Sequence, residues 1–146
     1  MLEFADRPAI ASQAASLRQW FDDPIVPGTN RHLDQLVREL AQYFRGERTE
    51  FTLPLEIAGT PFQRKVWDAL LQIPYGQTCS YGHIARALGR AGSQRAVGRA
   101  NGLNRLAILI PCHRVVRDDG TLCGYGGGLW RKRHLLDLEQ RVVAAG

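Results

Sequence analysis

The stretch from Ser80 to Asn104 constrains the fold most, because it carries two short helical patterns with a turn between them. Apolar side chains recur at helical spacing from Tyr81 to Leu88, and the segment 89–92, rich in glycine, interrupts the pattern. Ser93 is a candidate N-cap for a second helix that runs to about Asn101. The sequence therefore predicts a helix-turn-helix. The inner face of the second helix is expected to hold Ala96, Val97, Ala100 and Leu103.

The outer face of the second helix combines arginine with glycine. It consists of Arg95, Gly98, Arg99 and Gly102. Glycines beside arginines let a helix backbone come close to a polyanion, which suits a DNA groove and its phosphates. On this pattern alone, the competing interpretation is an ordinary solvated arginine face on a helical hairpin, which such a pattern more often represents.

The remaining pattern predicts an α/β chain of the α+β type in two parts. Residues 1–58 are expected to form a small N-terminal α/β subdomain, with strands at 2–5 and 51–57, a helix from Pro8 and a helix capped by Asn30. We expect the second of these helices to bury Leu33, Leu36, Val37, Leu40 and Phe44. Residues 59–146 are expected to form a mostly helical C-terminal domain, which opens with a capping box at 60–63 and contains a buried strand at 105–110, a short strand at 115–116 and a closing helix from Leu129.

Charge is distributed unevenly along the chain. Residues 1–59 contain six Arg and nine Asp or Glu, a net −3, whereas residues 60–146 contain thirteen Lys or Arg and five Asp or Glu, a net +8. The second part is the one expected to meet a polyanion, although a basic excess by itself also serves solubility. Three cysteines without paired spacing, no leader pattern and no apolar run of membrane-spanning length together predict a cytoplasmic protein without a membrane partner.

Cys112 and His113 are the candidate chemical centre. A thiol is mostly protonated at neutral pH, and an adjacent imidazole can take its proton directly or through one water. Glu139 on the last helix is the candidate partner that orients the imidazole. The competing interpretation is an inert buried cysteine beside a structural histidine. The sequence contains no P-loop, no H-E-x-x-H, no four-ligand zinc spacing and no complete dinucleotide-binding glycine motif, so neither a metal nor a cofactor is expected.

The string from Ile110 to Val116, Ile-Pro-Cys-His-Arg-Val-Val, resembles the active-site signature of the O6-alkylguanine-DNA alkyltransferases, also called methylated-DNA–protein-cysteine methyltransferases. The resemblance covers about residues 59–140, with matching segments in the expected order. These segments are 60–63 with 66–67, 73–76, 81–82, 95–98, Asn104, 124–125, 127–128 and 135–139.

The resemblance implies roles for individual residues. Cys112 would be the alkyl acceptor, with His113 as a base acting through a water and Glu139 holding His113. Tyr81 would rotate the phosphate of the damaged nucleotide and donate a hydrogen bond to the flipped guanine, while Asn104 would brace the link between the recognition helix and the active site. The DNA-binding set would be Ser93, Gln94, Arg95, Ala96, Gly98, Arg99 and Gly102, with Arg95 filling the vacated stack. The substrate pocket would contain Ala107, Pro111, Val115, Tyr125 and Gly126, with Tyr125 as one wall.

The activity implied by the resemblance is direct, stoichiometric and irreversible transfer of the alkyl group from O6-alkylguanine in double-stranded DNA to Cys112, with O4-alkylthymine as a second expected substrate. Each molecule would act once as a monomer, without a cofactor, with its recognition helix in the minor groove. The chain departs from the family at three points: it lacks the usual first β-hairpin, and it has Gly126 and Ala107 where some relatives carry Ser and Pro.

Other functions stay open at this point. A protein could bind alkylguanine lesions without repairing them, although such proteins lack the acceptor cysteine that is present here. A Cys-His-Glu hydrolase and a transcription factor with an unreactive cysteine are further alternatives. Stoichiometry with alkylated DNA distinguishes among them.

Overall fold

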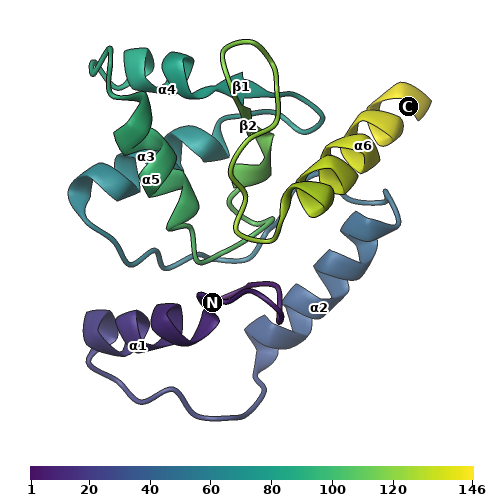
Figure 1. Ribbon diagram of the computed structural model, residues 1–146. Helices are drawn as coiled ribbons and strands as arrows, with labels where there is room; N and C mark the ends of the chain where they lie inside the picture. The colour runs from purple at the N-terminus through teal and green to yellow at the C-terminus, as the bar shows by residue number, and fades with distance from the viewer.

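Six α-helices and one two-stranded sheet make up the fold, in a computed structural model that describes all of residues 1–146 (Figure 1). The α+β class expected from the sequence is confirmed. In chain order the elements are α1 (Ile10–Phe21), α2 (Arg31–Phe44), α3 (Pro61–Leu71), β1 (Cys79–Ser80), α4 (Tyr81–Ala87), α5 (Gln94–Gly102), the 3₁₀ turn η1 (Cys112–Arg114), β2 (Val115–Val116) and α6 (Leu129–Ala145). None of the helices is both long enough and apolar enough to span a lipid bilayer.

Helix α3 is fixed by hydrogen bonds at its N-terminus and on its buried face. Thr60 and Gln63 form the predicted capping box, in which each side chain accepts from the other's backbone N–H. The Trp67 indole is 1% exposed and donates from Nε1 to the carbonyl of Ala100 at 2.9 Å, which ties α3 to α5. Around this contact lies the main core, formed by Val66, Trp67, Leu70, Ile73, Ile84, Ala85, Val97, Ala100, Ile110, Cys112 and Val115.

Helices α4 and α5 form the predicted helix-turn-helix, with two differences in detail. Ser93 occupies the N-cap position of α5, but its side chain makes no capping hydrogen bond, because its backbone is not in the extended conformation that aims a capping hydroxyl at the helix. Ala96 is exposed rather than on the inner face, which is instead formed by Val97, Ala100 and Asn101. The sheet beside the motif is parallel and pairs Cys79 with Val115.

The N-terminal part differs most from the sequence expectation. Asn30 caps α2 as predicted, accepting from two backbone N–H groups, but Val37 and Phe44 on its apolar stripe are 68% and 46% exposed and Leu33 is exposed as well. The buried positions of α2 are Glu39, whose carboxylate binds Thr52, and Tyr43, whose hydroxyl donates to Glu139 of the neighbouring helix α6 (Figure 1). Amphipathic spacing locates an apolar stripe but does not say whether anything covers it.

The two strands expected in the N-terminal part are not formed. Residues 51–57 run without strand pairing, and the backbone N–H of Thr52 is bound by the Glu39 carboxylate at 2.9 Å instead of by a neighbouring strand. At 2–5 only Leu2 pairs, in a single bridge with Leu106. A side-chain acceptor satisfies a backbone N–H as well as a neighbouring strand does. The pattern of residue types therefore could not predict whether this segment would pair as a strand or bond to a side chain.

The expected buried strand at 105–110 is a tight turn. Ala107 to Ile110 are all buried, as the apolar run predicts, but Ile108 has a φ of +71° and Ile110 N donates back to Leu106 O at 2.9 Å. The Asn104 side chain fixes this turn by donating to Ile110 O and accepting from Leu106 N, both at 2.9 Å. A left-handed β-branched residue is strained, and the Asn104 bonds supply the local support for it. The turn places Cys112 directly beside Asn104.

Candidate active site and DNA-facing surface

Cys112 lies at the start of η1, is 6% exposed and is oriented by an amide donor. Its Sγ accepts a hydrogen bond from Asn104 Nδ2 at 3.1 Å, and Asn101 Nδ2 donates to the Cys112 carbonyl at 3.4 Å. Burial raises the pKa of the Cys112 thiol, and the hydrogen bond from Asn104 opposes that effect. The resting group is therefore a thiol, next to a donor that stabilises charge when it develops on sulfur.

His113 is fully buried and bonded on one side only. Its Nε2 lies 2.7 Å from Glu139 Oε1, while Nδ1 is buried without a hydrogen-bond partner. Burial lowers the pKa of His113, against the hydrogen bond and charge of Glu139, which raise it. The imidazole is thus neutral at neutral pH. With the Nε2 proton directed to the carboxylate, Nδ1 is left as a free acceptor for a proton.

Glu139 accepts hydrogen bonds from several directions in a fully buried position. Its Oε1 accepts from Tyr43 OH at 2.7 Å and Arg114 Nη2 at 3.0 Å, and its Oε2 accepts from Arg114 Nε at 2.9 Å and Gly76 N at 3.0 Å. Burial would raise the pKa of this carboxyl, but the hydrogen bonds of His113 and Arg114, together with the charge of Arg114, hold the pKa at about 2. The carboxylate is ionised and can keep His113 in one tautomer.

A cavity of about 210 Å³ opens onto Cys112. Of the expected pocket residues, Ala107, Tyr125 and Gly126 line it, together with Asn104 of the expected catalytic set. Pro111 and Val115 do not, because Pro111 faces a separate cavity and Val115 is buried in the main core. The remaining lining residues are Glu3, Arg7, Asn101, Gly102, Gly124 and Gly127.

The N-terminal segment closes one side of this cavity, which the sequence did not indicate. Arg7 pairs with Glu3 and donates from Nη2 to the carbonyl of Gly102, at the end of α5, at 2.8 Å. A Cβ at Gly126 would overlap the Arg7 guanidinium, so the loop and Arg7 are in direct contact. The N-terminal segment and the loop at 124–127 thus both line the cavity at Cys112.

The expected DNA-binding residues lie on α5 or directly before it, and most of them are exposed. An open hollow of about 630 Å³ brings Tyr81, Gln94, Arg95 and Gly98 together with the loop at 117–124. Ala96, Arg99 and Gly102 are exposed and Ser93 is half-buried. Burial raises the pKa of Tyr81, so its hydroxyl keeps its proton and can donate it in a hydrogen bond.

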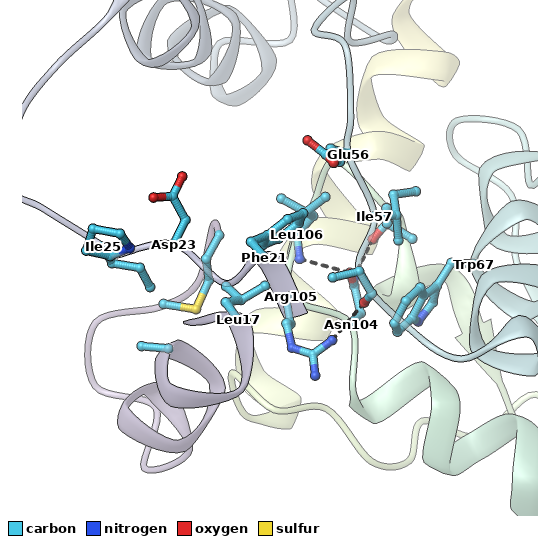
Figure 2. Close-up of a pocket in the computed structure, with 15 residues that line it drawn as sticks. Leu17, Phe21, Asp23, Ile25, Glu56, Ile57, Trp67, Asn104, Arg105 and Leu106 are labelled. Atoms are coloured by element: carbon cyan, nitrogen blue, oxygen red, sulfur yellow. Dashed lines mark hydrogen bonds between the residues drawn. The ribbon is translucent and has the colours of Figure 1, made fainter. Parts of the chain in front are cut away.

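A third cavity, of about 590 Å³, lies between α1 and the C-terminal part and is mainly apolar (Figure 2). Figure 2 shows Leu17 and Phe21 of α1 on one side and Trp67 with Asn104 on the other. Cys112 does not line this cavity, although Asn104 lines both. This apolar cavity therefore adds no reactive group to the site around Cys112.

Several residues that make hydrogen bonds in or beside the site were not among the predicted site residues, and Arg114, Tyr43 and Lys132 contribute side chains. Arg114 is part of the signature string, but its two bonds to Glu139 depend on α6 folding back onto η1. Tyr43 comes from α2 in the N-terminal part. Lys132 is fully buried and donates from Nζ to the carbonyls of Val115 and Cys123, at 2.5 and 2.8 Å. These two bonds join strand β2 to the loop that contains Cys123. The one signal for Lys132 was a lysine on the inner face of a helix, which local spacing does not separate from a solvated one.

No three His, Cys, Asp or Glu side chains lie close enough to hold a metal ion. All three cysteines are free thiols. The expectation that the chain works without a metal or cofactor stays a prediction.

Two family models match the chain. Residues 61–141 match the 6-O-methylguanine DNA methyltransferase DNA binding domain, and residues 3–57 match the 6-O-methylguanine DNA methyltransferase ribonuclease-like domain. A methylated-DNA–protein-cysteine methyltransferase of Mycobacterium tuberculosis is 58% identical over 109 residues, which cover 75% of this chain and 66% of the relative. The chain thus spans just under two thirds of the length of the mycobacterial relatives that it matches.

Solved structures agree with the family models. The crystal structure of Mycobacterium tuberculosis OGT in complex with DNA superposes with a TM-score of 0.73 at 55% identity, covering 75% of this chain and 68% of that one. Schizosaccharomyces pombe Atl1 in complex with damaged DNA containing O6-carboxymethylguanine superposes with a TM-score of 0.51 at 34% identity, covering 57% and 79%.

Proposed function

Because the chain belongs to the 6-O-methylguanine DNA methyltransferase family, we propose that it repairs DNA by moving the alkyl group of O6-alkylguanine onto its own Cys112. The observation that carries the proposal is the arrangement at η1: a cavity-lining thiol bonded to Asn104, beside an imidazole bonded to an ionised Glu139. This is the arrangement expected for an activated nucleophile.

Proton transfer precedes the attack. The neutral His113 takes the thiol proton on Nδ1 through one bridging water, and Glu139 stabilises the imidazolium that results. The Asn104 amide stabilises the charge on Sγ while it is a thiolate. The sulfur lone pair then forms the bond to the alkyl carbon, and the electrons of the broken carbon–oxygen bond remain on the guanine.

The guanine leaves as an anion that needs a hydrogen-bond donor. Tyr81 supplies it, since its hydroxyl stays protonated and it lies beside α5 at the open hollow. The protein product is a thioether, which water does not hydrolyse. No second step restores the thiol, so each molecule acts once.

DNA binds through the exposed side of α5. We assign the helix to the minor groove, because Gly98 and Gly102 remove side-chain bulk from the surface that must approach the duplex. The target nucleotide leaves the stack to reach Cys112, at an unstacking cost of a few kcal/mol, and Arg95 fills the space that it vacates. Double-stranded DNA is therefore the partner, bound mainly through its phosphates.

The remaining parts of the proposal concern the setting of the reaction. The proposed reaction needs only a monomer, because the thiol, base and donor all come from one chain. It acts in the cytoplasm, where free thiols such as its three cysteines persist. O4-alkylthymine is a second substrate, because its alkyl oxygen is also attached to a base that flips into the cavity.

Lesion binding without repair is the second candidate, favoured by the similarity to Atl1 bound to damaged DNA. The test is a titration of the protein into an excess of duplex containing one O6-methylguanine, with repaired DNA quantified at completion and Cys112→Ser as the control. Repair of one lesion per protein, absent in the variant, supports the proposal. Continued turnover indicates a hydrolytic enzyme, and retained lesion binding without repair indicates a sensor.

A further inference from the structure

Tyr43 connects the N-terminal part of the chain to the catalytic carboxylate. It lies on α2, is fully buried, and donates from its hydroxyl to Glu139 Oε1 on α6 at 2.7 Å, across 96 positions of sequence. Figure 1 shows α2 running alongside α6. A buried hydrogen bond from a neutral donor to a carboxylate is strong and directional, so the phenol fixes the orientation of this group.

The bond goes to the same oxygen that holds His113. Glu139 Oε1 lies 2.7 Å from His113 Nε2 and also accepts from Arg114 Nη2, whereas Oε2 accepts from Arg114 Nε and the backbone of Gly76. The positive end of the phenol dipole therefore sits next to the imidazole proton. It reduces the negative potential that Oε1 presents to His113, which disfavours the imidazolium.

We propose that Tyr43 is a positioning residue for alkyl transfer, which holds Glu139 and limits how strongly that carboxylate favours protonation of His113. The inference rests on the proposed function. It also assigns a task to the N-terminal part, since α2 delivers this donor to the Glu139 carboxylate, whose other hydrogen-bond partners belong to residues 76–114.

Several other groups face the His113–Glu139 pair and must be held constant. Arg114 on η1 and Lys132 on α6 lower the pKa of His113 by their charges, after the larger effect of burial. Cys112 precedes His113 directly on η1. Tyr75, from the loop after α3, stacks edge-on against Tyr43 with ring centroids 6.0 Å apart, but its buried hydroxyl has no hydrogen-bond partner.

Tyr75 therefore provides a matched control. Tyr43→Phe and Tyr75→Phe each delete one phenolic oxygen near the same carboxylate, but only the first removes a hydrogen bond from it. The experiment measures the single-turnover rate of methyl transfer from an O6-methylguanine duplex between pH 4.5 and 8 for the full chain and both variants. The folded state of each protein is verified by circular dichroism at every pH.

We expect the acidic limb of the rate profile, where His113 becomes protonated, to move to higher pH by about 0.5 to 1 unit in Tyr43→Phe. Transfer below the limb then slows by about 3- to 10-fold, while Tyr75→Phe follows the unaltered protein. Incorporation of 3-fluorotyrosine at position 43 keeps the packing and strengthens the donor, so it moves the limb to lower pH.

The outcomes separate the two claims. If the unaltered protein takes up no methyl group, the proposed function fails. If it transfers methyl and the acidic limb of Tyr43→Phe coincides with that of Tyr75→Phe, or if 3-fluorotyrosine does not move the limb downward, the role assigned to Tyr43 is wrong. The fluorinated protein decides the question if Tyr43→Phe does not fold.

Discussion

Acid should destabilise the protein in large part by protonating Glu139, and the loss of folding free energy can be calculated. The pKa of this carboxyl is about 2 in the folded protein against an ordinary 4.5, because His113 and Arg114 bind the ionised form. At about 1.4 kcal/mol per pKa unit, the difference corresponds to about 3 kcal/mol of folding free energy. A carboxyl with a lowered pKa stabilises the folded state above pH 4.5 and loses that contribution as the pH falls toward 2, with about 2 kcal/mol gone by pH 3.

The His113 imidazole adds to the acid sensitivity with the same sign. Burial lowers its pKa below 6.5, so the unfolded chain binds this proton more readily than the folded one, and stability decreases as the pH falls below 6.5. Glu139→Gln keeps the shape of the side chain and removes its titration. The variant should be less stable than the unaltered protein at pH 6, and this deficit should shrink between pH 5 and 3.

Urea unfolding at a series of pH values measures both free energies, with the fluorescence of the buried Trp67 reporting the core. The expected result is a stability curve for the unaltered protein that falls by about 2 kcal/mol more than that of Glu139→Gln between pH 5 and 3. Parallel curves would refute the reasoning, because they would mean that the folded protein does not hold Glu139 in its ionised form.

Three further predictions follow from the glycines and arginines. The double variant Gly98→Ala, Gly102→Ala should fold normally, or gain up to about 1 kcal/mol of stability per site, since neither added Cβ overlaps a neighbouring atom. It should nevertheless bind duplex DNA more weakly in a fluorescence anisotropy assay, because the added methyl groups keep the helix away from the groove. Unchanged affinity would contradict a close approach of the helix to the groove. Gly59→Ala should cost about 1 to 3 kcal/mol in urea unfolding, because its Cβ would overlap the ring of Trp67, and equal stability would disprove that contact. Arg99→Ala should lower the slope of log affinity against log salt by about 1, because Arg99 is exposed on α5 and has no assigned role in the base stack, whereas an unchanged slope would place Arg99 away from the phosphates.

Local signals in the sequence predicted the features that depend on neighbouring residues. Asn30 and Thr60 cap their helices as expected, because a capping bond joins a side chain to backbone only two or three positions away. The helix-turn-helix was equally accessible, since its turn and both apolar faces lie within one short segment. Cys112 and His113 were candidates because they are adjacent, and their expected roles came from the resemblance. The structure places Cys112 beside the expected Asn104 and His113 beside the expected Glu139.

Features that depend on distant contacts were not predictable. The apolar run at 105–110 indicated burial correctly, but a buried turn held by Asn104 has the same composition as a buried strand. In α2 the buried face is the one whose Tyr43 contacts α6, whereas Val37 on the apolar stripe stays exposed. The pattern of residues within the helix does not reveal which face will be covered. Arg7 reaches Gly102 across 95 positions, and sequence spacing contains no record of that contact.

The most direct measurement is the location of the transferred group. The protein is incubated with a duplex that carries one isotopically labelled O6-methylguanine, digested, and sequenced by tandem mass spectrometry over the peptides that contain Cys79, Cys112 and Cys123. The account predicts one labelled methyl thioether, on Cys112 alone, that survives prolonged incubation in buffer. A label on either other cysteine, or a repaired duplex with no label on the protein, would contradict it.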